Sequence, residues 1–584
     1  MNAAAGINAL ADATVLAALT ETPEVAAQLG VQSLPALSGV RDKLASCSPD
    51  ALMRRHDMLR DAERKRSALD LSAAAPDAAL SGEIFSFFLH YPCFDGWTGT
   101  AAADFVFHDY PVKHKDGAHT LALETLTLFH EVKTIDDAET YLARVAALPR
   151  VFEEIGESLE ETRRRNTLAP RNTLAIVRAE FGALAALAPA SNELFGAFAN
   201  RLEHAESLDL VSQKQFLERA ETEIASCTVP AIARLCDTID AALSDASDDL
   251  GVWRLPEGDA YYAYRLKKET TTDFSAEDIH KAGLENVAQL NSAIEVASKR
   301  LGRWRGDVAT SFAALGAENI YEDEHAARAR ILQEHQALMA HMRAALRPHF
   351  GAFPARDCIV QACARRLEDK RTTCYYPPSL DGARGGLFEL NLAQELAKTP
   401  AERRIVAYHE AYPGHHMQLA LAQENPHTPL FRRILVNAAY IEGWAKYAET
   451  LPFALGLDDD PIAELYRMRA ELISASNLAL DTGIHAKRWR RDHALDFCMR
   501  STGLGRAMAD YLVDRVSVTP GQTCAYKIGL DAMRNLRRTT EEKLGANFPL
   551  SAFHDLVLAE GAMPLATLEA HARGKLSATS LDKT

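Results

Sequence analysis

His409-Glu410-Ala411-Tyr412-Pro413-Gly414-His415-His416 is the stretch of this 584-residue sequence that decides how the chain is interpreted, together with Glu442-Gly443-Trp444-Ala445 downstream. Imidazole and carboxylate groups are ligands of catalytic zinc, and two histidines with one glutamate leave a coordination position open for water. Glu410, next to the first histidine, is placed to accept a proton from that water. We therefore predict a Zn²⁺ site built from His409, a second histidine and Glu442, with Glu410 as general base.

The spacing of the histidines departs from the usual His-Glu-x-x-His pattern, because position 413 is a proline. In a straight helix His415 would lie roughly 9 Å along the axis from His409 and about 240° around it, and His416 roughly 10.5 Å along. Neither arrangement lets two rings reach one ion at a zinc–nitrogen distance of about 2.0 Å. Proline removes an amide donor and glycine accepts unusual backbone angles. We expect a bulge at Pro413-Gly414 that brings His415 to His409, with His416 as the less favoured ligand.

Two helices are expected to carry these residues. The first begins at Thr399-Pro400-Ala401-Glu402, which has a cap residue, a proline and an acid in the usual order. The second is expected over 430–451. Glu442 and Glu449 share one face of it, so Glu449 is either a carboxylate that orients a ligating histidine or a solvated acid. Gly443 is expected to let another backbone come close to Glu442.

Further blocks accompany these two motifs in a fixed order: Trp253-Arg254-Leu255-Pro256, Tyr261-Tyr262, Thr270-Thr271-Thr272, Ile279-His280, Tyr376-Pro377-Pro378-Ser379-Leu380-Asp381-Gly382, Asp481-Thr482-Gly483-Ile484-His485, Pro520-Gly521-Gln522 and Tyr526-Lys527-Ile528-Gly529. In this order they resemble the domain-of-unknown-function 885 (DUF885) family of bacterial proteins, which is grouped with gluzincin-type metallopeptidases. One difference is Arg384-Gly385-Gly386, where the family has Arg-Pro-Gly.

The resemblance implies a mainly α fold: a large helical gluzincin-like metallohydrolase with a small β-sheet edging the active-site cleft. Helix is also expected because Ala, Leu, Arg and Glu dominate and few stretches alternate strictly. We expect a soft boundary near residue 250, with a helical N-terminal region (1–250, including a loop at 91–96) covering the cleft and a zinc-binding catalytic region at 251–584. Leu387–Leu392 is expected as the strand that pairs with an extended peptide.

The resemblance also suggests residues that contact the substrate. Gluzincins commonly supply a Tyr or His from the C-terminal part to stabilise the oxyanion, and Tyr526 is the candidate, with simple packing as the alternative. His485 could bind substrate, oriented by Asp481 four residues earlier, or could be a structural histidine. Arg384 could bind a substrate carboxylate through two hydrogen bonds, although a surface arginine is the commoner case. His114, His119 and His130 have no ligand spacing and are interpreted as scattered.

Composition limits the location and the partners. A net charge of −16 argues against nucleic acid and anionic membranes, which favour basic surfaces. No apolar stretch approaches membrane-spanning length, and the first residues lack the basic region of a signal peptide. Nine cysteines without framework spacing indicate free thiols in a reducing compartment. We expect a cytoplasmic protein whose partner is a small-molecule or short-peptide substrate, with a homodimer left open.

The expected function is therefore zinc-dependent hydrolysis of amide or peptide bonds in short peptides or small amide-linked metabolites. Two alternatives remain open. One is a non-peptide amidohydrolase or lyase that uses the same metal. The other is a non-catalytic binding protein that keeps the fold, although Glu410, which metal binding alone does not require, argues against it.

Overall fold

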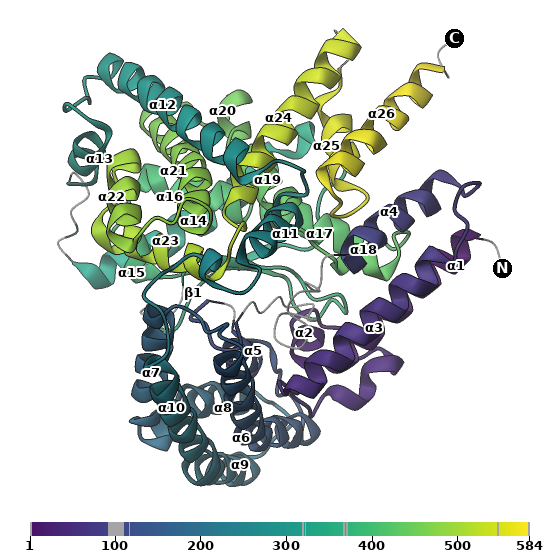
Figure 1. Cartoon of the computed structure of the whole chain (residues 1–584), viewed down its shortest axis with the longest axis vertical. Helices are drawn as coiled ribbons and strands as arrows, with labels where there is room; N and C mark the ends of the chain where they lie inside the picture. Colours follow the sequence, from purple (N-terminus) through teal and green to yellow (C-terminus); the bar gives the residue numbers. More distant parts are fainter. Residues whose placement is uncertain are drawn as a thin grey trace. The chain divides into compact units, whose positions relative to one another are not determined.

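The computed structural model describes residues 3–90, 110–115, 117–317, 321, 323–365, 368, 372–545 and 548–581. The chain divides into two compact units, Met1–Tyr261 and Tyr262–Thr584 (Figure 1). The predicted loop at 91–96 lies outside the described residues. Whether the first unit covers the cleft of the second stays a prediction.

The first unit is helical, and its centre is the packing of α10 on α6 and α7. A capping box of Thr134 and Asp137 begins α6, and Val145, Leu148 and Ile155 on that helix are completely buried. The helices and helical turns of this unit are α1 (Ala3–Glu21), α2 (Pro23–Gln28), η1 (Pro35–Val40), α3 (Pro49–Ser67), α4 (Pro76–His90), α5 (Ala118–Glu124), η3 (Thr125–Phe129), α6 (Ile135–Arg164), α7 (Arg171–Ala185), η4 (Pro189–Ser191), α8 (Glu193–Glu203), α9 (Leu210–Glu223), η5 (Ile224–Thr228), α10 (Val229–Leu243) and η6 (Val252–Arg254).

A helix that crosses the division, α11 (Gly258–Thr270), leads into the second unit. There α12 runs beside α21, and α19 packs against α24 (Figure 1). The other helices and turns are α12 (Ala276–Arg300), α13 (Val308–Ala317), α14 (Glu324–Ala345), η7 (Arg347–His349), α15 (Leu392–Leu396), α16 (Pro400–Glu410), α17 (His415–Glu424), α18 (Leu430–Ile434), α19 (Ala438–Ala448), α20 (Leu451–Ala454), α21 (Pro461–His485), α22 (Arg491–Thr502), α23 (Arg506–Val518), α24 (Cys524–Leu544), α25 (Leu550–Leu558) and α26 (Leu565–Leu581). The predicted mainly α fold is confirmed.

One small sheet interrupts these helices in the order β1-β3-β2. Strand β1 (Cys358–Ala362) lies parallel to β3 (Gly386–Leu390), and β2 (Cys374–Tyr376) lies antiparallel to it. A strand just before the helix that carries His409 is therefore present as predicted. Its expected role as the edge strand is wrong, because β3 is the central strand, is buried along its whole length and has both sides occupied by its neighbours. The free edges of the sheet belong to β1 and β2.

The predicted helix starts can be checked directly. Helix α16 begins as expected: the Thr399 side chain accepts a hydrogen bond from the Glu402 amide, and Pro400 is the first helical residue. The helix expected over 430–451 is instead divided. Leu435 is extended after α18, and Asn437 caps the start of α19 through the amide of Tyr440.

No helix among the described residues is both long enough and apolar enough to span a bilayer.

Candidate metal centre

The chain between the two candidate histidines breaks the helix. Helix α16 ends at Glu410, Ala411 leaves the helical region, and α17 begins at His415 after a cis Tyr412–Pro413 peptide bond. A Cβ atom at Gly414 would collide with the carbonyl oxygen of His409, so only glycine fits this turn. The predicted distortion at Pro413-Gly414 is therefore confirmed.

Trp444 fixes this turn to the helix that carries the candidate glutamate ligand. Its indole nitrogen donates a hydrogen bond of 3.0 Å to the Pro413 carbonyl oxygen, and its side chain is completely buried. This hydrogen bond therefore fixes the turn between the two histidines against helix α19.

His409, His415 and Glu442 converge. One potential ligand atom from each lies within 4.8 Å of the others. Among the described residues, these three form the group of His, Cys, Asp or Glu side chains that could hold a metal ion. The Nε2 atoms of His409 and His415 lie 3.3 and 3.5 Å from Glu442 Oε2. The two imidazole rings are nearly perpendicular, with centroids 4.7 Å apart. Three potential ligand atoms, each from a different helix, thus face one small volume.

The chemistry of this donor set fits a zinc ion. Glu442 Oε2 is buried and forms no hydrogen bond with the described residues, although both ring nitrogens lie close to it. Two imidazoles and a carboxylate are a common set of three protein ligands in catalytic zinc sites. A cation between them would give the orphaned carboxylate oxygen the partner that it lacks.

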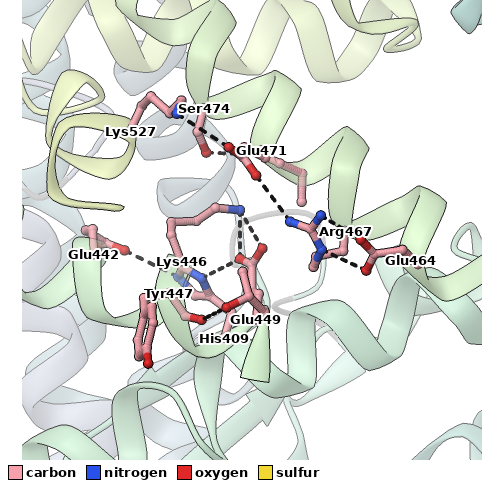
Figure 2. Close-up of polar contacts among 12 residues, drawn as sticks. His409, Glu442, Lys446, Tyr447, Glu449, Glu464, Arg467, Glu471, Ser474 and Lys527 are labelled. Atoms are coloured by element: carbon pink, nitrogen blue, oxygen red, sulfur yellow. Dashed lines mark hydrogen bonds and ion pairs between the residues drawn. The ribbon is translucent and has the colours of Figure 1, made fainter. Parts of the chain in front are cut away.

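A second carboxylate orients His409. Glu449 Oε1 accepts a hydrogen bond of 2.9 Å from His409 Nδ1, which leaves Nε2 facing Glu442 (Figure 2). Lys446 Nζ in turn donates to both oxygens of Glu449 at 2.7 and 2.6 Å. Since Glu449 is only 3 % exposed, the alternative that it is a solvated acid is excluded. Such an outer carboxylate fixes the tautomer and the direction of a ligating histidine.

The electrostatics of the centre favour positive charge. Burial alone would lower the pKa of His409, yet the nearby carboxylate of Glu442 and the hydrogen-bonded carboxylate of Glu449 raise it to about 10. Burial would raise the pKa of Glu442, but the two histidines hold it well below its ordinary value. The two carboxylates therefore favour a positive charge beside them, which is the kind of charge that a metal cation would bring.

Glycine allows Tyr526 to approach this group. Gly443 on α19 meets Gly529 on α24 so closely that a Cβ atom at 443 would lie 2.6 Å from the backbone of Gly529. The expectation that another backbone comes near Gly443 is therefore confirmed. Tyr526, one turn before Gly529, stacks over His409 with ring centroids 6.3 Å apart. Burial raises the pKa of Tyr526, and the charge of Glu442 adds to the rise, so its hydroxyl keeps its proton.

Glu410 is the last residue of α16 and is half-buried. Burial raises its pKa, the charges of His409 and His415 oppose that rise, and the charge of Glu442 adds to it. It is not one of the grouped ligand residues.

His416, the alternative ligand, points elsewhere. It is completely buried, its Nδ1 lies 2.9 Å from the Tyr375 hydroxyl, and its Nε2 lies 3.1 Å from the Arg356 carbonyl oxygen. Burial lowers the pKa of His416 to about 4. With both ring nitrogens occupied, it has no lone pair to offer a metal, and the geometry favours His415.

His485 and Asp481 have packing roles in this structure. His485 is completely buried, and its Nε2 lies 2.9 Å from the Val516 carbonyl oxygen. Asp481 does not orient it as expected; it accepts hydrogen bonds from the Tyr262 hydroxyl, the Gly521 amide and the Thr523 hydroxyl. A side chain enclosed in this way is a poor substrate contact, because a ligand could not reach it without opening the core.

Arg384 is half-buried on the loop before β3, where its amide donates to the Ser379 hydroxyl at 2.8 Å. Burial raises the pKa of Tyr375, and the charge of Arg384 opposes that rise. Arg384 is not among the residues grouped at the centre, and its contact with substrate stays a prediction.

The sequence motifs gave no role to three residues at or near the centre: Lys446, Trp444 and Arg515, whose side chain donates a hydrogen bond to the Tyr526 hydroxyl. Lys446 lies one turn before Glu449 on the same helix, so its spacing could have indicated the pair. Arg515 is 73 positions from Glu442 with no motif around it, and only the fold reveals it.

Fold and site together define a mainly α protein with a candidate metal centre between its helices. The chain belongs to a family of bacterial proteins of unknown function, DUF885, whose model matches residues 23–571. It resembles the crystal structure of a “putative lipoprotein” from Colwellia psychrerythraea, with a TM-score of 0.95 and 24% identity over 99% of this chain and 100% of that one. A second such protein, of unknown function, from Shewanella oneidensis matches with a TM-score of 0.67 and 15% identity over 96% and 98% of the two chains. No functionally curated protein matches the sequence.

Proposed function

We propose that this protein is a zinc-dependent hydrolase of amide bonds in short peptides or small amide-linked metabolites. The observation that carries the proposal is the convergence of His409, His415 and Glu442 on one volume, where a buried oxygen of Glu442 has no hydrogen bond. Glu410 and Tyr526 adjoin this group and supply the two further functions that amide hydrolysis requires, a proton acceptor and a hydrogen-bond donor.

His409, His415 and Glu442 would hold the metal, with His409 directed by Glu449. When bound, a divalent cation such as zinc supplies Lewis acidity, which polarises a carbonyl group and lowers the pKa of a water molecule.

Glu410 accepts a proton from the attacking water molecule, whose oxygen forms a bond to the carbonyl carbon of the substrate. The carbon–nitrogen bond then breaks, and Glu410 returns the proton to the departing amine. A carboxyl group whose pKa is raised by burial suits both transfers, because it holds a proton more readily than a solvated glutamate does. The hydroxyl of Tyr526 donates a hydrogen bond to the carbonyl oxygen as negative charge develops there.

The alternatives are distinguished by chemistry rather than by fold. A lyase or a non-peptide amidohydrolase could use the same ligands, so the substrate screen has to include both amides and non-peptide compounds. A binding protein would not need Glu410, which lies beside the ligands without being one of them. Kinship with gluzincin peptidases belongs to the proposal and rests on the sequence motifs, and the cytoplasmic location belongs to it and rests on composition.

Elemental analysis of the native protein tests the proposal, followed by a screen of dipeptides and N-acylated amino acids. About one zinc per chain and hydrolysis that disappears on chelation and returns with zinc are expected. His409→Ala serves as the control without metal. Hydrolysis by thoroughly metal-free protein would refute the proposal, as would a zinc-loaded protein that hydrolyses no amide.

A further inference from the structure

Arg515 lies at the edge of the candidate centre, on α23. Its side chain is half-buried, and its Nη2 donates hydrogen bonds to the Tyr526 hydroxyl at 2.9 Å and to Gln522 Oε1 at 2.7 Å. The guanidinium carbon lies 5.6 Å from the centre of the Tyr526 ring. Tyr526 is therefore shared between this arginine and His409, over which it stacks.

The charge of Arg515 has no carboxylate partner among the described residues. Its two hydrogen-bond acceptors are a neutral hydroxyl and a neutral amide. Other arginines nearby are paired: Arg491 binds Asp510 and Asp514, and Arg534 binds Glu471. A guanidinium withdrawn from water without an anion costs free energy, so an anionic ligand would stabilise this position.

The sum of the charges around the centre also favours an anionic ligand. With a divalent cation bound, the negative charges are the three carboxylates of Glu410, Glu442 and Glu449. The positive charges are the two of the cation and one each on Lys446 and Arg515. The sum of these charges is then one positive charge. A substrate that carries one negative charge would neutralise it.

We infer that Arg515 binds a free carboxylate of the substrate, which would favour N-acylated amino acids and short peptides with a free C-terminus. This inference rests on the proposed function. The planar fork of arginine matches a carboxylate through two parallel hydrogen bonds, and only one of its nitrogens is used by Tyr526 and Gln522.

The geometry selects the bond next to that carboxylate. A carboxylate on Arg515 would lie beside Tyr526, whose ring is 6.3 Å from that of His409. One residue of extended chain spans about 3.5 Å, so the amide one residue from the carboxylate is the one that would lie beside Tyr526.

Pairs of compounds that differ only at the carboxylate test the inference. We would measure the binding of N-acetylated dipeptides and of their C-terminal amides by calorimetry, using the zinc-loaded Glu410→Gln protein so that nothing is consumed. Hydrogen bonds to charged groups give the acids a roughly 10- to 100-fold tighter dissociation constant. In the added Arg515→Gln background the acid should bind no more tightly than the amide, and Arg515→Lys should keep part of the difference.

Two further variants serve as controls. Arg506→Gln, on the same helix but exposed and paired with Asp510, should keep the full difference between acid and amide. Arg384→Gln tests the competing arginine, and loss of the difference in that variant alone would overturn the inference. Zinc content and melting temperature of each protein verify that the site is intact.

The outcomes distinguish failure of the carboxylate contact from failure of the proposed hydrolase function. If the active protein hydrolyses acids and amides equally well, the inference fails and the proposed function stands. If the Arg515→Gln protein retains its metal and still discriminates, Arg515 only positions Tyr526 and the inference fails. If zinc-loaded protein neither binds nor hydrolyses any member of either series, the proposed function fails, and the inference with it.

Discussion

At the scale of single residues, the proposed function gives the neighbours Glu410 and His409 different roles: the Glu410 side chain would transfer protons, and the His409 side chain would hold the metal. We predict that Glu410→Gln keeps its zinc, because Glu410 is not among the converging ligand residues. Turnover should fall by roughly 10²- to 10⁴-fold, because an amide cannot accept the proton of water. Zinc content and rate are to be measured on the same preparation. Loss of zinc would show that Glu410 is a ligand, and a near-normal rate with full zinc would show that it is not the base.

A second prediction separates two adjacent histidines. His415→Ala should lose the metal, because its Nε2 lies 3.5 Å from Glu442. His416→Ala should keep the metal but lose about 1–3 kcal/mol of unfolding free energy, because it leaves the Tyr375 hydroxyl without its buried partner. Metal analysis and denaturant unfolding of both variants decide this. If His416→Ala is the variant that releases zinc, the ligand assignment is wrong.

These residues also show what the sequence could predict. The motif alone identified His409, His415 and Glu442, because proline and glycine restrict the backbone between the histidines in a calculable way. The role expected for His485 depended on its surroundings, and no pattern in the chain reveals that this residue is completely buried. Arg515 could not be found either, because the contact with Tyr526 joins two helices whose packing the sequence does not display.

At the scale of elements, helix starts were predictable and helix ends were less so. Thr399 and Ser275 cap α16 and α12 through local hydrogen bonds that a few residues encode. The division between α18 and α19 was missed, although Asn437 is a good cap residue. The place of β3 in the sheet was also missed, because strand order depends on pairing between distant segments.

The third prediction concerns the crossing of α19 and α24. Gly443→Ala should destabilise the protein by about 1–3 kcal/mol, because the added Cβ would lie 2.6 Å from the Gly529 backbone and force the helices apart. The shift would carry Glu442 with it, so zinc affinity should fall as well. The matched control is Gly316→Ala in α13, where nothing lies within 4 Å of the new atom. An unchanged zinc affinity in Gly443→Ala would show that the crossing does not position the ligand.

At the scale of the whole molecule, the ligands all belong to the second compact unit. We predict that chelation lowers the melting temperature of this unit and leaves that of the first unit unchanged. A ligand present at 1,000 times its dissociation constant stabilises the folded state by about 4 kcal/mol. Calorimetry with and without zinc should show one transition that moves and one that does not. A transition of the first unit that moved equally would show that the two units unfold together.

Composition predicted the mainly α character of the molecule well, because residues that favour helix dominate. The sequence analysis expected a soft boundary near residue 250, and the contacts divide the chain at Tyr261, within a helix that continues across the division. Such a division has no linker of altered composition, and it exists only because contacts concentrate on either side of it.

The break between α16 and α17 has one more consequence, which concerns helix dipoles. An unbroken helix would have passed through the site with its partial charges cancelled by neighbouring turns. Here the C-terminal end of α16, with its partial negative charge, carries His409, and the N-terminal end of α17, with its partial positive charge, begins at His415. The partial negative charge of one end would favour a cation, and the partial positive charge of the other would favour the negative charge that develops on a substrate. The same proline–glycine turn that brings the histidines together thus supplies both polarities at the place where the reaction would need them.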